Sequence, residues 1–325
     1  MEAVLRYFVE DRPTGPVKRF FLRKFRHVKP VPNFPKIIQI QTQSGCNARC
    51  LFCPNGKVIN KLSQGRMDVS LFERLADECT AHRPQRINPY LMNEPLTDPE
   101  IDKRIAYLVK RRKPPTKIHI ATNGSLLTAD MAERLIDSGL DSISISFQGF
   151  TEEAFEQTML GLKFEETFEN VNNFLALAQK RDSPMKRRVT TVATKLTEKH
   201  IDAAASHWRG LGATFRVLPL ANRSHDAVEG GDLNTKKWRL FSWCNRMMTQ
   251  AYVLFNGDLV LCCVDWERTT IMGNVSERSI EEVWNSEYYR EFRKRFLAGD
   301  VKGTLCATCK TTGKSKEELA LDNDG

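Results

Sequence analysis

Six short segments rich in β-branched residues alternate with helical patterns between residues 36 and 220, and this alternation restricts the fold more than any other feature. The predicted strands are 36–43, 87–92, 117–122, 141–147, 188–195 and 214–220. Strands separated by helices form a parallel sheet with the helices outside it, because each helix returns the chain to the start of the next strand. The order therefore predicts an α/β fold, either an open doubly wound sheet or a partial (β/α)6 barrel of the TIM type. In both folds, ligands bind at the C-terminal ends of the strands.

Local signals define the ends of several predicted helices. Ser70 and Glu73 have the spacing of a capping box, so a helix is expected from 70 to 81. Thr128 is the expected N-cap of a helix that stops at Gly139. Cys79 falls on the apolar face of the first of these helices, which predicts a core residue rather than a ligand.

The location of the chain decides how its nine cysteines are interpreted. No apolar run approaches the roughly 20 residues of a membrane span, and the N-terminus does not resemble a signal peptide, so a cytoplasmic location is expected. In a reducing compartment, clustered cysteines indicate metal binding rather than disulfides. Seven of them form two groups, Cys46, Cys50 and Cys53, followed by Cys244, Cys262, Cys306 and Cys309.

The first cysteine group follows the first predicted strand, where a dinucleotide-binding fold would carry GxGxxG. Three thiolates on one loop can hold three irons of a cubane cluster and leave the fourth iron open. A structural zinc site would require a fourth ligand. The group therefore predicts a cluster with one open position for a substrate or cofactor.

The pattern Cys-x3-Cys-x2-Cys, with Phe52 before the third cysteine and a strand before the first, resembles the radical S-adenosylmethionine (SAM) superfamily. The resemblance implies that the open iron of a [4Fe–4S] cluster chelates SAM. An electron, from a donor such as flavodoxin or ferredoxin, then cleaves SAM to methionine and a 5′-deoxyadenosyl radical. That radical removes a hydrogen atom from the substrate.

The same resemblance implies further SAM-binding residues at the ends of the strands. The segment Met92 to Leu96 matches the family's Gly-Gly-Glu-Pro stretch at its acidic residue but lacks the glycines. The residues implied are Phe52, Glu94, Asn123, Ser146, Gln148, Lys195 and Leu218. No catalytic acid or base is predicted.

The second cysteine group lies around a predicted hairpin at Asn256–Asp258 and a helix that starts at Ser279 with Glu282. By themselves, four cysteines could hold zinc. The spacing resembles the SPASM and twitch extensions of radical SAM enzymes, which implies an auxiliary [4Fe–4S] cluster with all four positions filled. Cys263 is the alternative to Cys262 as a ligand.

Four regions follow from these patterns: a basic N-terminal arm (1–35), a radical SAM core (36–222), an auxiliary cluster domain (223–312) and a polar tail (313–325). The arm is expected either to pack on the domain as a solvated segment or to contact an anionic substrate, an acidic partner or a membrane surface.

A fully ligated auxiliary cluster has no open iron, so the resemblance implies that it carries electrons. The expected reaction is the dehydrogenation, or a related rearrangement, of a sugar-like or cyclitol-like small molecule, neutral or anionic. The alternative is the crosslinking, thioether formation or epimerisation of a ribosomally made peptide. A hypothesis of another class is a non-catalytic metal-cluster protein that binds nucleic acid. It explains the net charge of +9, but it does not explain the open three-cysteine site or Glu94.

Overall fold

The computed structural model describes residues 31–220, 233, 239–240, 244 and 246–311. The expectations for the basic arm up to residue 30 and for the polar tail lie outside these residues. Within the described part of the chain, no helix is both long and apolar enough to cross a bilayer.

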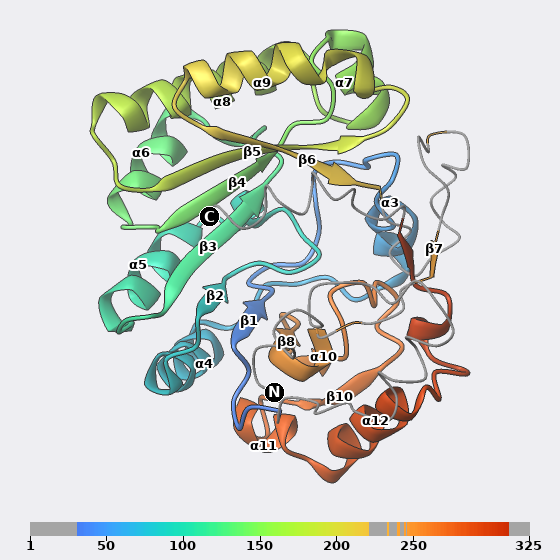
Figure 1. Ribbon diagram of the computed structural model, residues 1–325. Helices are drawn as coiled ribbons and strands as arrows, with labels where there is room; N and C mark the ends of the chain where they lie inside the picture. The colour runs from blue at the N-terminus through green and yellow to red at the C-terminus, as the bar shows by residue number, and fades with distance from the viewer. Residues whose placement is uncertain (1–30, 221–232, 234–238, 241–243, 245, 312–325) are drawn as a thin grey trace, which may run out of the picture.

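Six parallel strands lie side by side in chain order, with helices covering their outer face (Figure 1). The strands are β1 (Ile37–Ile40), β2 (Arg86–Asn88), β3 (Lys117–Thr122), β4 (Ser142–Ser146), β5 (Lys186–Ala193) and β6 (Thr214–Pro219). The covering helices are α4 (Val69–His82), α5 (Ile101–Arg111), α6 (Ala129–Asp137), α7 (Glu152–Thr158), α8 (Phe164–Lys180) and α9 (Ile201–Gly210). The sheet does not close, since β6 forms one edge, so the predicted α/β partial barrel is confirmed.

The C-terminal part of the chain continues the same sheet on the other side of β1. Strand β8 (Gln250–Val253) pairs with β1 in parallel, and β9 (Asp258–Val260) and β10 (Ile271–Asn274) follow as antiparallel neighbours. Gly257 makes the hairpin turn with φ +88°, a conformation that glycine adopts without strain. The predicted hairpin is present, but the sequence did not indicate that it would pair with β1.

Two short helices, α11 (Ile280–Trp284) and α12 (Glu287–Ala298), complete the C-terminal part, which lies in the lower half of Figure 1. The carboxylate of Glu78 on α4 accepts hydrogen bonds from the first amides of α11, at 3.1 and 3.0 Å. The indole of Trp284 donates to the carbonyl of Pro32 at 2.8 Å. One continuous hydrophobic cluster contains buried residues of both parts, so the C-terminal elements are packed firmly on the barrel.

The predicted helix ends are mostly confirmed, with one correction. Thr128 and Ser279 cap their helices, and Ser279 forms the expected capping box with Glu282. The capping box predicted at Ser70 and Glu73 is wrong, because Asp68 is the N-cap and accepts from the amides of residues 70 and 71. An aspartate also favours the positive end of the helix dipole, so it competes well with serine for this position. Cys79 is fully buried in the core, as predicted.

Candidate functional site

The loop that carries Cys46, Cys50 and Cys53 leaves β1 and is fixed by backbone hydrogen bonds to three other segments. These bonds measure 2.8–3.0 Å and join Ser44 to Gly65, Gly45 to Glu94, Arg49 to Leu160 and Leu51 to Thr158. Gly45 has φ +95°, where a side chain would be strained, so glycine permits the turn into the loop. After the loop, the chain forms a short helix that the sequence did not predict, α3 (Asn55–Val58).

The three thiols line a cavity of about 420 Å³ at the C-terminal ends of the parallel strands. This volume is typical of a site for a cofactor and a small ligand. The other predicted residues that line the cavity are Phe52, Glu94, Asn123, Ser146, Gln148 and Leu218. Lys195 is not among the lining residues, and it is exposed. Apart from Lys195, the structure brings the residues predicted for the first cluster and for SAM together in one cavity.

Glu94 is buried, and its carboxylate accepts three hydrogen bonds. Oε1 accepts from the hydroxyl of Thr122 at 2.6 Å and from the amide of Leu96 at 3.1 Å, while Oε2 accepts from the amide of Asn123 at 2.7 Å. Burial raises the pKa of Glu94 to about 7, and the three hydrogen bonds oppose this rise. A carboxylate has about four acceptor positions, so one remains for a donor in the cavity.

A polar network joins the cysteine loop to the end of β3. The side-chain amide of Asn123 donates to Asn47 at 2.8 Å, and that of Asn47 donates to the hydroxyl of Ser125 at 2.8 Å. The amide of Ser125 donates back to Asn123 at 2.9 Å. Asn123 is thus a positioning residue for the loop as well as a cavity residue. No sequence motif indicated Asn47, because its partners lie more than 70 residues away.

Gln148 is held at the end of β4 by the neighbouring strand. Its carbonyl oxygen accepts from the amide of Val192 on β5 at 2.6 Å. Ser146 lies two residues earlier on the same inward face, and Leu218 of β6 lies in register with Val192. The cavity wall opposite the cysteine loop is therefore built on strands rather than on mobile loops.

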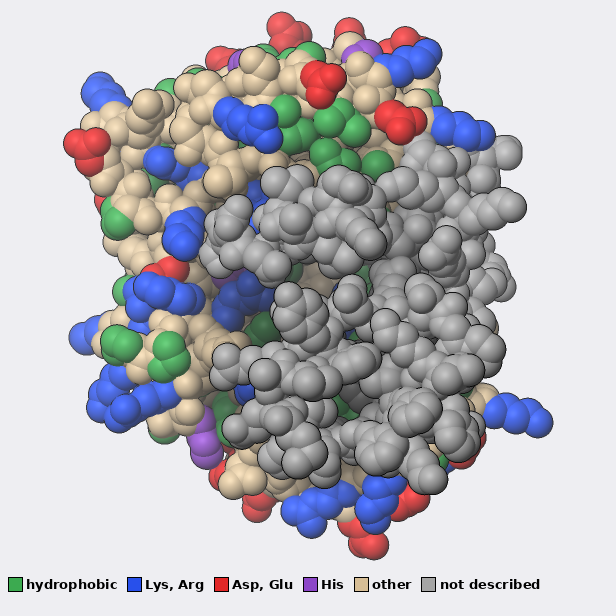
Figure 2. All heavy atoms as spheres, in the orientation of Figure 1, with side chains coloured by type: hydrophobic (Ala, Val, Ile, Leu, Met, Phe, Trp, Pro, Cys, Tyr) green, Lys and Arg blue, Asp and Glu red, His purple; other side chains and the backbone are tan. Residues whose placement is uncertain are grey.

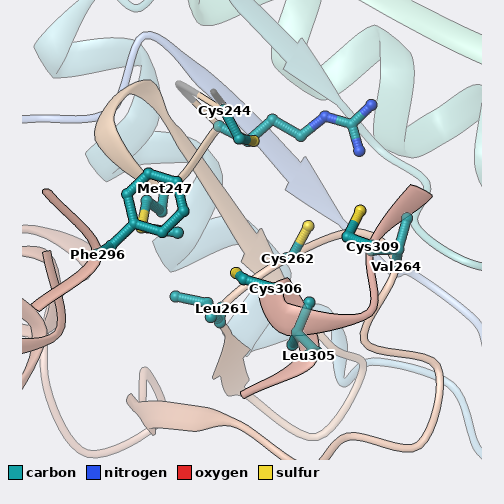
Figure 3. Close-up of a pocket in the computed structure, with 10 residues that line it drawn as sticks. Cys244, Met247, Leu261, Cys262, Val264, Phe296, Leu305, Cys306 and Cys309 are labelled. Carbon is teal, nitrogen blue, oxygen red and sulfur yellow. The ribbon is translucent and has the colours of Figure 1, made fainter. Parts of the chain in front are cut away.

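Cys244, Cys262, Cys306 and Cys309 line a second, smaller cavity of about 60 Å³. Figure 3 shows the side chains of these four cysteines around this space. Cys262 follows β9, while Cys306 and Cys309 lie in and after a 3-10 turn (Leu305–Ala307). Cys263, the alternative ligand, lines the first cavity instead.

The chemistry of both cysteine groups fits iron–sulfur clusters. Burial raises the pKa of Cys46 to about 12 and that of Cys306 to about 11, so without a metal these thiols keep their protons. Bound iron supplies the positive charge that stabilises buried thiolates. Among the described residues, no three His, Cys, Asp or Glu side chains converge closely enough to hold one metal ion. A cubane has no such requirement, because each thiolate binds a different iron.

Arg246 lies between the two cavities and lines both of them, as do Val264 and Cys309. Its guanidinium donates to the sulfur of Cys263 at 3.3 Å. The sequence did not identify Arg246 as a site residue, because it belongs to no motif, and it indicated Cys263 only as the alternative to Cys262. Their position makes the two cavities direct neighbours.

Comparisons with known proteins agree with this geometry. The family model of the radical SAM superfamily matches residues 40–205, and a model of an iron–sulfur cluster-binding domain, SPASM, matches residues 244–310. An S-adenosyl-L-methionine-dependent 2-deoxy-scyllo-inosamine dehydrogenase of Niallia circulans is 24% identical over 87% of this chain and 95% of its own length.

Two solved structures have a similar fold. BtrN in complex with AdoMet and 2-DOIA has a TM-score of 0.58 and 23% identity, covering 84% of this chain and 92% of its own. SuiB of Streptococcus suis, bound to the precursor peptide SuiA, has a TM-score of 0.60 and 16% identity, covering 93% and 76%. Since the first family model spans just over half of the 325 residues and begins on the strand that leads into Cys46, the chain belongs to the radical SAM superfamily, whose members bind a [4Fe–4S] cluster and SAM.

Proposed function

We propose that this radical SAM enzyme oxidises or rearranges a sugar-like or cyclitol-like small molecule, with the second cluster as an electron conduit. The observation that carries the proposal is the direct contact of a three-thiol cavity with a four-thiol cavity, through the lining residues that they share. In a dehydrogenation, a carbon-bound hydrogen atom passes to the 5′-deoxyadenosyl radical, a hydroxyl proton leaves, and the remaining electron needs an acceptor. The similarity to a SAM-dependent dehydrogenase over most of both chains supports this reaction.

In this proposal, Cys46, Cys50 and Cys53 hold the first cluster, and Cys244, Cys262, Cys306 and Cys309 hold the second. The SAM-binding residues are Phe52, Glu94, Asn123, Ser146, Gln148 and Leu218, and Lys195 stays a prediction for the SAM carboxylate. When bound, the first cluster and SAM supply the radical. Flavodoxin or ferredoxin is the proposed electron donor, and the reducing cytoplasm is the proposed location, since none of the nine cysteines forms a disulfide.

Deuterium transfer tests the proposed reaction. The reconstituted protein is incubated anaerobically with SAM, dithionite and cyclitols or sugars deuterated at carbon, and the 5′-deoxyadenosine is analysed by mass spectrometry. We expect one deuterium in the 5′-deoxyadenosine, together with a ketone or a rearranged product. Deuterium that comes only from labelled peptides would show that peptide modification, the function supported by the fold of SuiB, is correct instead.

Glu94→Gln is expected to weaken SAM binding at least about tenfold, because the amide offers the SAM amino group a poorer acceptor than a carboxylate. The affinity of the wild type for SAM should fall as the pH drops through about 7, since Glu94 becomes protonated below its raised pKa. The variant should lose this slope. Equilibrium dialysis of SAM between pH 6 and 8 measures both effects, with the exposed Glu133→Gln on α6 as the control. A wild-type affinity that does not change over this range would contradict the role of Glu94.

Arg246→Gln is expected to lower the reduction potential of the second cluster by tens of millivolts. A partly buried positive charge beside thiolate ligands favours the reduced, more negative cluster, and the substitution removes that charge. A redox titration followed by electron paramagnetic resonance measures the potential, and Arg209→Gln on the exposed side of α9 is the matched control. If the second cluster has the same reduction potential in the wild type and in Arg246→Gln, Arg246 does not tune that cluster.

A further inference from the structure

Asn55 is a buried polar residue on the wall of the larger cavity, and neither the cysteine pattern nor the family resemblance assigns it a role. It is the first residue of α3, two residues after Cys53, and only 4% of it is exposed. It lines the cavity together with Cys50 and Cys53. Two residues span at most about 7 Å of chain, so a cluster held by Cys53 lies within reach of the Asn55 side chain.

The side-chain amide of Asn55 has no structural partner. An asparagine at the start of a helix usually caps it by accepting a hydrogen bond from a backbone amide. In α3 the cap position belongs to Pro54, and no side chain caps the helix. Among the described residues, no group forms a hydrogen bond with the Asn55 amide, whose atoms are not enclosed by protein on the cavity side. A buried amide without a partner costs free energy, so this amide favours a ligand in the cavity.

Helix α3 packs directly on the cysteine loop, and this packing fixes the position of Asn55. A β-carbon at Gly56 would lie 3.2 Å from the β-carbon of Arg49, which is tighter than ordinary contact, so glycine permits the close approach. The amide of Val58 donates to the carbonyl of Pro54 at 3.2 Å, and the side chain of Val58 is buried in the hydrophobic core. Asn55 is therefore held at the cavity by a packed turn.

The larger cavity offers few charged groups to a bound cluster. Among its described lining residues, the Lys, Arg, Asp and Glu side chains are only Glu94 and Arg246, whereas most charged side chains lie toward the margin of the face in Figure 2. Glu94 is an acceptor, and Arg246 borders the second cavity and donates to Cys263. The sulfur atoms of an iron–sulfur cluster accept hydrogen bonds, and these bonds tune its reduction potential. Asn55 supplies such a donor next to Cys53.

We propose that the side-chain amide of Asn55 donates a hydrogen bond to a sulfur atom of the first cluster and makes that cluster easier to reduce. The inference rests on the proposed position of the first cluster at Cys46, Cys50 and Cys53. Reduction adds one electron and makes the cluster more negative, so the hydrogen bond is stronger in the reduced form than in the oxidised form. Asn55 therefore shifts the equilibrium toward the reduced cluster, which is the form that cleaves SAM.

Asn55→Leu tests the proposal, because leucine has the same branched shape and no donor. The reconstituted full-length protein is titrated with dithionite and redox mediators in the absence of SAM, and the first cluster is followed by electron paramagnetic resonance. Its signal is recognised by its change when SAM is added afterwards. We expect the reduction equilibrium to shift about tenfold toward the oxidised cluster, which is about 59 mV for a one-electron couple.

Two further variants complete the comparison. Asn55→Asp replaces the donor by a negative charge at unchanged size, so it should shift the equilibrium further than Asn55→Leu. Asn60→Leu makes the same change at an exposed position outside the cavity and should keep the wild-type potential. If Asn55→Leu loses iron, Asn55→Asp decides the comparison in its place.

Iron content and the equilibrium binding of SAM are measured on the same samples. If the Asn55 variants keep the wild-type potential but bind SAM at least about tenfold more weakly, the amide contacts SAM and the proposal is wrong. Equal potentials with equal SAM binding contradict it as well. If the wild type still cleaves SAM in either case, the proposed function stands. A wild type that holds no iron at the first cysteine group would refute the proposed function itself.

Discussion

Cys46→Ala is expected to reduce the cleavage of SAM by about a thousandfold or more and to lower the iron content from about eight to about four atoms per chain. Cys46 is one of three thiols in the larger cavity, and alanine cannot replace a thiolate ligand. A cluster with two protein ligands is not held in the loop after β1, so SAM loses the iron to which it would bind. Iron analysis and the yield of 5′-deoxyadenosine measure the two effects.

Cys79→Ala is the matched control for this experiment. Cys79 is a fully buried thiol on α4, outside both cysteine cavities, and its loss should cost about 1–2 kcal/mol of stability without loss of iron. If Cys46→Ala keeps all its iron and cleaves SAM at the wild-type rate, the first cluster does not depend on this cysteine.

Cys262→Ala and Cys263→Ala are expected to differ sharply although the residues are adjacent. Cys262 lines the four-thiol cavity, so its replacement should remove the second cluster and reduce substrate turnover by about a hundredfold or more, while SAM cleavage continues. Cys263 lines the larger cavity, where it accepts a hydrogen bond from Arg246, so its replacement should leave both clusters in place.

Iron content and the ratio of product to 5′-deoxyadenosine separate the two variants. The Cys262→Ala protein should form 5′-deoxyadenosine without a matching amount of product, because the electron left on the substrate has no acceptor. Loss of iron from Cys263→Ala but not from Cys262→Ala would reverse the assignment of the fourth ligand. Full turnover in Cys262→Ala would show that the second cluster takes no part in the reaction.

The sequence predicted the barrel because its signals are local. Strand β3 has the predicted bounds, 117–122, and Thr128 caps the following helix as expected, since both depend on neighbouring residues. The short C-terminal strand β8 contains its own apolar residues, but its partner β1 lies more than 200 residues earlier. No local pattern specifies such a pairing, so the sequence predicted a hairpin without its place in the sheet.

The same distinction applies to the site. Cysteine spacing indicated both thiol groups, and the match of Met92 to Leu96 to a family motif indicated Glu94. The structure places these residues around two cavities. Arg246 and Asn47 belong to no motif, and their roles depend on partners that only folding brings near.

The production of 5′-deoxyadenosine by the anaerobically reconstituted wild-type protein tests the central claim most directly. With SAM and dithionite, and without any added substrate, we predict methionine and 5′-deoxyadenosine in equal amounts. A protein that carries iron at both cysteine groups but forms no 5′-deoxyadenosine would contradict the claim that Cys46, Cys50 and Cys53 hold a cluster with an iron open to SAM.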